Sequence, residues 1–190
     1  MQGLESHYFP TAIEWRRWLE AHHAKSQGIF LVFYTVDHEK ESMRWEEAVR
    51  EALCFGWIDS TVKSLGNGKR RQYFCPRKPG SVWSRLNKQH LDELTRAGKM
   101  HPAGLARIAA ARADGSWSAL DDVENGVIPD DLEAAFGAHP DARAFYEEIS
   151  WTHQKSYLYW LFQAKRETTR ARRISEITRL LRAGKKNRYE

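Results

Sequence analysis

The sequence predicts an α+β fold, in which a small β-sheet is wrapped by helices and followed by a helical C-terminal unit. Residues 29–36 form a β-branched and aromatic run, which is typical of a strand buried on both faces. Residues 57–64 and 71–76 flank a Gly-Asn-Gly turn and are predicted to form a β-hairpin. Residues 157–181 keep their apolar positions at helical spacing over about seven turns.

The first two helices are predicted from their capping residues. Thr11 followed by Glu14 is typical of a capping box, so we expect a helix from this point to about Lys25. Ser42 can cap the second helix, which Gly56 closes at its C-terminus. Both helices have apolar faces that can pack on the sheet.

Two more helices are expected after the hairpin. Ser84 caps the third helix, and Gly98 ends it. Pro102 suits the first position of a fourth helix that continues to Asp114. Residues 117–127 are acidic and show no clear period, so we expect an ordered loop there.

The last third of the chain is expected to be helical. Residues 129–137 and 140–149 are predicted as two short helices, each opened by a proline. The long helical pattern that follows can be divided near Glu167. We therefore expect an α+β core domain over residues 1–127 and a helical unit over residues 128–190.

Composition excludes several classes of protein. The chain has 190 residues, of which 42% are hydrophobic and 29% charged, which is enough apolar material for a core. Its mean hydropathy is -0.68, and no apolar run approaches the roughly 18 residues that a membrane span needs. The N-terminal residues lack the pattern of a secretory signal, so we expect a cytoplasmic protein that does not insert into membranes. Cys54 and Cys75 are the only cysteines and are expected to be free thiols.

The charges fall into three blocks. Residues 63–99 carry ten Lys and Arg against two acids, a net charge of +8. Residues 114–148 carry ten acids against one arginine, a net of -9, and residues 165–190 carry ten basic residues against three acids, a net of +7. The blocks can attract one another within the fold, so the basic balance only weakly indicates an anionic partner.

Asp59 is a candidate for chemistry because it directly follows an apolar pair at the start of a strand. It could act as an acid, a base or an anchor for a cation near Lys63 and Arg85. The structural alternative is a carboxylate that holds the hairpin through an ion pair or a turn cap.

The loop after the hairpin is a candidate site for an anion. The helix N-terminus near Ser84 offers backbone donors, and Arg77 or Arg85 could close over the bound group. Trp83 could stack a planar group or a sugar face, or it could plug the core of a proline-punctuated connection. The full set of candidate ligand-binding residues is Trp57, Asp59, Lys63, Arg77, Trp83, Ser84, Arg85 and Asn87.

Other motifs for catalysis and metals are absent from the sequence. His90 lies about one turn beyond Asn87 and could join Asp59 as an acid–base pair, although a lone histidine on a helix is more often structural. The histidines and cysteines lack the spacing of metal ligands. No P-loop or dinucleotide fingerprint is present, so we expect no cofactor and no metal, and no catalytic residue is assigned.

The C-terminal basic residues raise the question of nucleic-acid binding. Arg166, Arg170, Arg173 and Lys186 could line one face of a helix and neutralise phosphates. Acidic residues interrupt this face, and the acidic block can instead serve as its partner within the chain. Alternatively, this helical region could pack on a protein partner.

Several segments resemble the YdeI/OmpD-associated family. Residues 52–60, with the sequence Ala-Leu-Cys-Phe-Gly-Trp-Ile-Asp-Ser, resemble its signature, and residues 74–87, 98–104 and 164–180 are similar to its further blocks. Ser60 stands where many relatives have glycine. The resemblance implies a bacterial cytoplasmic protein associated with bacteriocin protection or envelope stress, and it implies no catalytic residues.

These observations lead to three functional hypotheses. The first is a stress- or bacteriocin-resistance protein that binds a small anionic ligand or a protein partner. Its site would be the cleft between the turn at residues 55–60 and the loop at residues 77–87, with tryptophan walls and arginine contacts. The second is a small-molecule enzyme, and the third is a nucleic-acid-binding accessory protein that uses the basic blocks.

Overall fold

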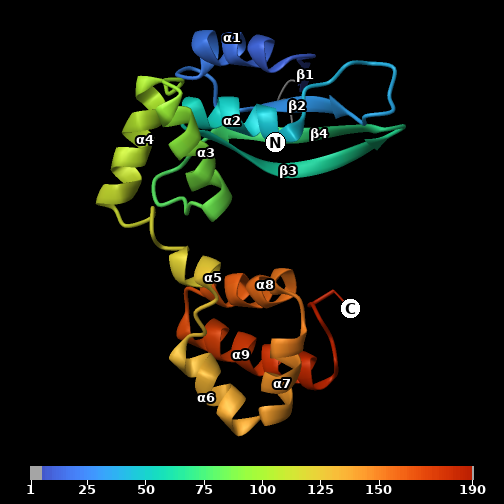
Figure 1. Cartoon of the computed structure of the whole chain (residues 1–190), viewed down its shortest axis with the longest axis vertical. Helices are drawn as coiled ribbons and strands as arrows, with labels where there is room; N and C mark the ends of the chain where they lie inside the picture. Colours follow the sequence, from blue (N-terminus) through green and yellow to red (C-terminus); the bar gives the residue numbers. More distant parts are fainter. Residues whose placement is uncertain (1–5, 190) are drawn as a thin grey trace. The chain divides into compact units, whose positions relative to one another are not determined.

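The computed structural model describes residues 6–189 and confirms the α+β class (Figure 1). The chain divides into two compact units, the first ending at Ala119 and the second beginning at Leu120. The first unit contains the sheet and four helices of the described region, and the second is helical. The second unit begins eight residues before the boundary expected at residue 128, because the expected loop contains helix α5 (Asp121–Asn125).

The sheet of the first unit has the strand order β1-β2-β4-β3. Strand β2 (Ile29–Tyr34) is central and buried, as predicted, and pairs antiparallel with β4 (Lys69–Pro76). Strand β3 (Trp57–Gly66) completes the predicted hairpin with β4. Strand β1 (Ser6–Tyr8), which the sequence pattern did not indicate, pairs parallel with β2.

A tight turn and a bulge shape the hairpin. Gly66, Asn67 and Gly68 all have positive φ angles, which suits glycine and asparagine. The pairing then shifts: Asp59 lies opposite Phe74 and Val62 lies opposite Gln72, so β3 holds one more residue than β4 over this stretch. Because Phe74 and Gln72 share one face of the sheet, the bulge places Asp59 and Val62 on that same face.

Four helices accompany the sheet. They are α1 (Ala12–His22), α2 (Trp45–Cys54), α3 (Arg85–Arg96) and α4 (Pro102–Ala113). Thr11 caps α1 by accepting a hydrogen bond from the Glu14 amide at 3.4 Å, as predicted. The predicted cap at Ser42 is wrong, because the Ser42 hydroxyl accepts from the Tyr34 amide instead. Arg44 occupies the N-cap position of α2, and its amide donates to the Glu47 carboxylate at 2.6 Å.

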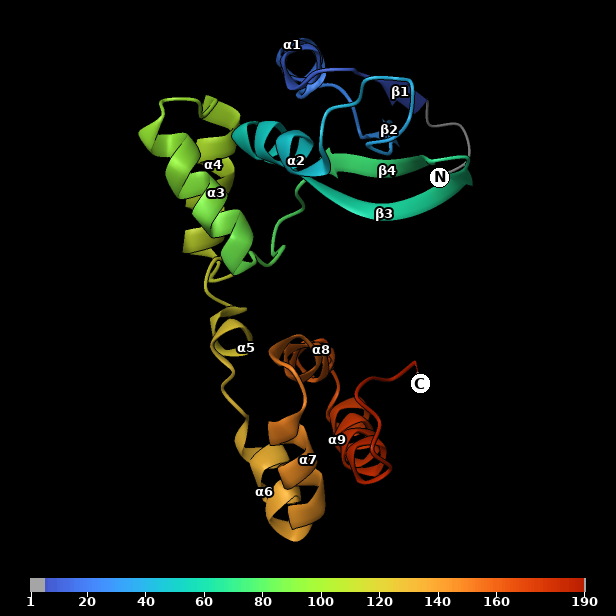
Figure 2. The same cartoon turned by 45° about the vertical axis from the view of Figure 1, so that its right-hand side comes forward.

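Aromatic side chains fill the core between the sheet and the helices. Trp15 of α1 makes edge contacts with Trp57 and Phe74, with ring centroids 6.2 and 5.8 Å apart. Figure 2 shows α1 and α2 on one face of the sheet, while the tip of the hairpin extends past α2. The helices therefore cover the part of this face around Trp57 and Phe74, and they leave the part near the hairpin turn uncovered.

The second unit consists of five helices. After α5 come α6 (Asp130–Ala138), α7 (Pro140–Glu148), α8 (Trp151–Phe162) and α9 (Glu167–Arg182). The expected division of the last helical segment is confirmed, because α8 ends at Phe162 and α9 begins at Glu167. The unit has its own buried side chains: Leu132, Phe136, Tyr157, Leu161, Ile177 and Leu181. Every helix within residues 6–189 is too short or too polar to span a bilayer.

Helix α4 packs against the end of α2 through a glycine. A Cβ atom added at Gly104 would lie 2.2 Å from the Cys54 carbonyl oxygen, so no side chain fits there. Gly137 of α6 provides a contrast, because a Cβ atom added to it meets nothing within 4 Å.

We expect Gly104→Ala to destabilise the first unit by about 1–3 kcal/mol, because the backbone of α4 must move away from α2. We expect Gly137→Ala to stabilise the second unit by up to about 1 kcal/mol, since alanine favours the helix. Urea unfolding followed by circular dichroism measures both effects. Equal effects of the two substitutions would contradict this packing.

Candidate functional site

The two tryptophans of the predicted cleft lie in the core. Trp57 is 1% exposed and Trp83 is 2% exposed. The Trp57 indole donates to the His23 carbonyl oxygen at 3.3 Å. The Ser84 hydroxyl accepts a hydrogen bond from the Asn87 amide at 3.3 Å, so Ser84 caps α3 as predicted. These residues support the fold and do not present flat walls to solvent.

Arg77 is a buried cation that stacks on Trp83. The guanidinium carbon lies 3.6 Å from the centre of the Trp83 ring, and one nitrogen donates to the Val82 carbonyl oxygen at 3.1 Å. Arg77 is only 3% exposed. Burial lowers its pKa to about 10, although the negative charge of Asp59 opposes that shift.

The cavity beside Arg77 is small. Its volume is about 30 Å³, and its lining includes Arg77, Trp83, Asp114 and Ser116. The Arg77 Nε and Ser116 Oγ atoms are buried without a hydrogen-bond partner within the described part of the chain. A space of this size fits one or two water molecules. It is too small for the planar group or sugar face expected at this position.

Asp59 positions a tryptophan. Its carboxylate accepts from the Trp45 indole at 2.9 Å and also from the Gln72 side-chain amide. The expected ion pairs with Lys63 and Arg85 are not among its contacts, and both of these cations are exposed. Asp59 therefore fixes the start of α2 to the sheet.

The predicted acid–base pair of Asp59 and His90 is not assembled. His90 is 4% exposed, and its Nδ1 atom lies 2.9 Å from a guanidinium nitrogen of Arg50. Because guanidinium nitrogens only donate, Nδ1 is the acceptor of this hydrogen bond. Arg50 also forms an ion pair with Glu93 at 2.5 Å. His90 thus belongs to a link between α2 and α3.

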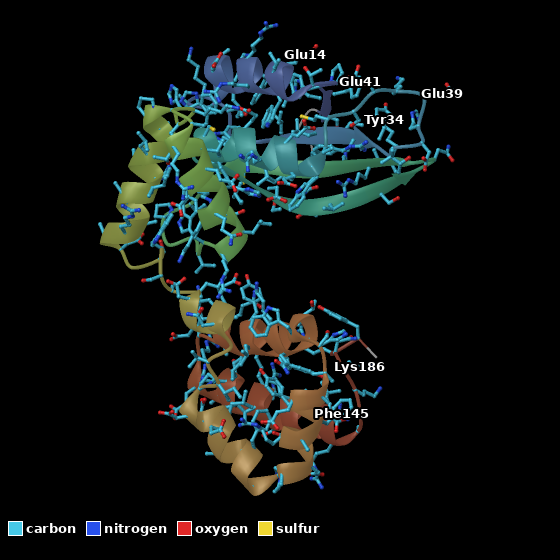
Figure 3. The ribbon with its side chains drawn as sticks, in the orientation of Figure 1. Glu14, Tyr34, Glu39, Glu41, Phe145 and Lys186 are labelled. Atoms are coloured by element: carbon cyan, nitrogen blue, oxygen red, sulfur yellow. The ribbon has the colours of Figure 1, made fainter. Side chains whose placement is uncertain are left out.

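A larger pocket lies near the turn of the hairpin, on the helix-facing side of the sheet but beyond the part that α2 covers. Its volume is about 660 Å³. We call it the hairpin pocket. Its lining comprises Phe33, Tyr34, Thr35, Val36, Asp37, Met43, Arg44, Trp45, Val62, Ser64, Gly66, Asn67, Gly68, Lys69 and Arg70. In Figure 3, Tyr34 marks the end of β2, beside the loop that carries Glu39 and Glu41.

The hairpin pocket combines an apolar floor with a cationic rim. Phe33 and Met43 are buried, whereas Val62 is 50% exposed. The Arg70 guanidinium lies 5.4 Å from the centre of the Phe33 ring, and the Lys69 ammonium lies 5.9 Å from that of Tyr34. Neither cation forms an ion pair or hydrogen bond through its side chain within residues 6–189.

Sequence reasoning missed the hairpin pocket because its residues come from three separate segments, 33–37, 43–45 and 62–70. The available signal was a cation-rich hairpin with an apolar residue, Val62, in its exposed half. Simple alternation does not place Val62 on the same face as Asp59, because the bulge lies between them.

Two C-terminal arginines, Arg170 and Arg182, pair with acids of the acidic block, so the self-pairing that the alternative interpretation predicted holds for one of the four candidate cations, Arg170. Arg170 contacts Asp131 at 2.5 Å, and Arg182 contacts Asp141 at 2.8 Å. Arg173 donates to the Trp160 carbonyl oxygen. The other two candidates, Arg166 and Lys186, are exposed (Figure 3 labels Lys186). Residues 6–189 contain no group of three or more His, Cys, Asp or Glu side chains placed to hold a metal ion.

The two parts of the chain match two different family models. Residues 7–107, slightly more than half of the chain, match a domain of unknown function, DUF8412, so the chain belongs to that family. Residues 125–184 match the family described as bacteriocin-protection, YdeI or OmpD-associated, which confirms the family resemblance in the second unit. The signature-like segment at residues 52–60 falls within the first match. No curated protein and no solved structure matches the chain.

We expect Arg77→Ala to lower the free energy of unfolding by about 2–4 kcal/mol, because it removes a buried stem that packs on Trp83. Arg77→Met keeps the volume and removes the buried charge, so we expect a change within about 1–2 kcal/mol. Urea unfolding compares the two variants. An Arg77→Met variant as unstable as Arg77→Ala would show that the charge itself is required.

The pair of Arg170 and Asp131 makes stability depend on pH. A hydrogen bond from Arg170 lowers the pKa of Asp131 below its ordinary value of 3.8. The contribution of this ion pair to the free energy of unfolding is therefore complete above pH 3.8, and it is lost as the pH falls further and Asp131 is protonated. We expect Arg170→Ala to cost up to about 1 kcal/mol at pH 7 and less at pH 2. Thermal unfolding at both pH values tests this, with Arg172→Ala as the unpaired control. An equal loss at both pH values would exclude the pair as the cause.

Proposed function

We propose that this member of the DUF8412 family is a bacteriocin-protection or stress-associated protein that binds a small amphipathic anion in the hairpin pocket. The match of residues 125–184 supports the association with bacteriocin protection. The observation that carries the binding proposal is the combination, in one pocket of about 660 Å³, of an apolar floor and two cations without polar partners among residues 6–189. Pockets of this size and character are typical of small-molecule sites.

The floor selects an apolar group. Phe33, Met43 and Trp45 come from β2, the loop and α2, and Val62 faces them from β3. Val62 is half exposed and Trp45 partly exposed, and removal of their apolar surface from water favours binding by about 25 cal/mol per Å² buried. Asp59 accepts a hydrogen bond from the Trp45 indole at 2.9 Å, so the largest ring of the floor is held in position before a ligand arrives.

The rim selects a negative charge. Three of the lining side chains, Arg44, Lys69 and Arg70, are cationic, whereas Asp37 is the one carboxylate among the lining residues. The Arg70 guanidinium is planar and presents several donors, which suits a carboxylate, sulfonate or phosphate. Since Arg70 also stacks on Phe33, it connects the charged rim to the apolar floor.

We expect the protein to bind 1-naphthalenesulfonate and to discriminate against the neutral 1-naphthylmethanol, as measured by isothermal titration calorimetry. Arg70→Ala should weaken sulfonate binding by about 10-fold or more, because a charge-assisted hydrogen bond is lost. Val62→Asp should abolish binding, because it places a carboxylate on the floor.

Lys63→Ala is the matched control, since it removes a cation from the same hairpin that does not line the pocket. Sulfonate binding should be nearly unchanged in this variant. Equal losses in Lys63→Ala and Arg70→Ala, or equal binding of the neutral compound, would argue against the proposal. Equal losses would indicate nonspecific attraction of the sulfonate to the cationic hairpin. Equal binding of the neutral compound would indicate a purely apolar site.

A further inference from the structure

A second hollow lies on the helical unit, between the end of α8, the outer face of α9 and the residues that follow α9. Its volume is about 530 Å³, and the lining residues that carry the argument are Trp160, Arg172, Glu176, Arg179, Arg188 and Tyr189. We call it the α9 groove. We propose that the α9 groove binds a nucleotide, with the base stacked on Tyr189 and the phosphate held by Arg172.

Three side chains in the α9 groove form a stacked ladder. The Arg188 guanidinium carbon lies 4.5 Å from the centre of the Trp160 ring and 5.1 Å from that of Tyr189. Arg173 is a second cation near Trp160, with its guanidinium carbon 5.2 Å from the ring centre. Trp160 therefore has two guanidinium neighbours, whereas within residues 6–189 Tyr189 has Arg188 alone and is 85% exposed.

Tyr189 is the aromatic ring of this group that is available for stacking. It is 85% exposed, and its hydroxyl is held by a hydrogen bond from Arg188 at 3.0 Å. An exposed aromatic ring beside a guanidinium is the arrangement on which nucleobases stack, and such stacking tolerates any base. A nucleobase stacked on Tyr189 would add one more planar group to the stack of Trp160, Arg188 and Tyr189.

The charge of the α9 groove is positive after its internal pairs are counted. Arg179 and Glu176 neutralise each other through two hydrogen bonds at 2.7 and 2.8 Å. Arg172 forms no ion pair or hydrogen bond through its side chain within residues 6–189, and Arg188 contacts only neutral groups there. Arg172 lies one turn from Glu176 on α9 and lines the same groove, so its donors can bind a phosphate.

This groove differs from the basic face that the sequence indicated. Arg170 is paired with Asp131, and Arg173 is used against Trp160. The available cations are Arg172 and Arg188, and the aromatic partner is at the C-terminal end. The chemistry of one nucleotide fits this set, whether the nucleotide is free or part of a single strand.

The test measures binding of AMP and of a single-stranded adenine octamer by fluorescence anisotropy, with labelled octamer and AMP as competitor. Arg172→Ala and Tyr189→Ala should each weaken binding by about 5-fold or more, and Tyr189→Phe should restore it, because the ring is kept. Tighter binding of the octamer with strong salt dependence would identify a strand as the source, whereas equal affinities would identify a free nucleotide.

Two control variants separate this site from other effects. Arg182→Ala removes an arginine of α9 that is paired with Asp141 and does not line the α9 groove, so binding should be unchanged. Lys63→Ala removes a hairpin cation that lines neither the α9 groove nor the hairpin pocket, and it should also leave binding unchanged. No binding of either probe, or equal weakening in Arg182→Ala and Arg172→Ala, would overturn the assignment.

Discussion

The Asp59 carboxylate is the contact on which the candidate site of the first unit depends. It accepts from the Trp45 indole at the start of α2 and from the Gln72 amide in β4. One side chain therefore connects the first turn of a helix to two strands. A half-buried carboxylate with two donors is well satisfied, and breaking these bonds leaves polar groups without partners. This contact fixes the position of Trp45, the largest ring in the floor of the hairpin pocket.

The length of the hairpin strands and the bulge in β3 explain why a pocket forms there. Strands β3 and β4 continue beyond the part of the sheet that α2 covers (Figure 2). The aromatic core around Trp15 and Phe74 fills the covered part, whereas Val62 and Arg70 lie on the uncovered part. The bulge keeps the apolar side chain of Val62 on the helix-facing side of the sheet. The core therefore ends where α2 stops covering the strands, and the hairpin pocket lies on the uncovered part of the same face.

The local elements could be predicted from the sequence, because they depend on neighbouring residues. The strand at residues 29–34, the Gly-Asn-Gly hairpin turn and the caps at Thr11 and Ser84 follow from backbone preference and side-chain hydrogen bonds. The burial of the Arg77 and Trp83 side chains could not be predicted, since it depends on how the loop packs on segments that are distant in the sequence. A tryptophan stacked on an arginine has the same local sequence whether it is exposed or buried.

The central claim is that the hairpin pocket binds an amphipathic anion. Its most direct test follows the indole N–H signals of the eight tryptophans by ¹H–¹⁵N NMR during titration with 1-naphthalenesulfonate. The structure predicts that the Trp45 signal shifts in proportion to occupancy, while those of the buried Trp57 and Trp83 stay nearly constant. A shift of the Trp83 signal with Trp45 unchanged would contradict the account and return the site to the loop beside Arg77.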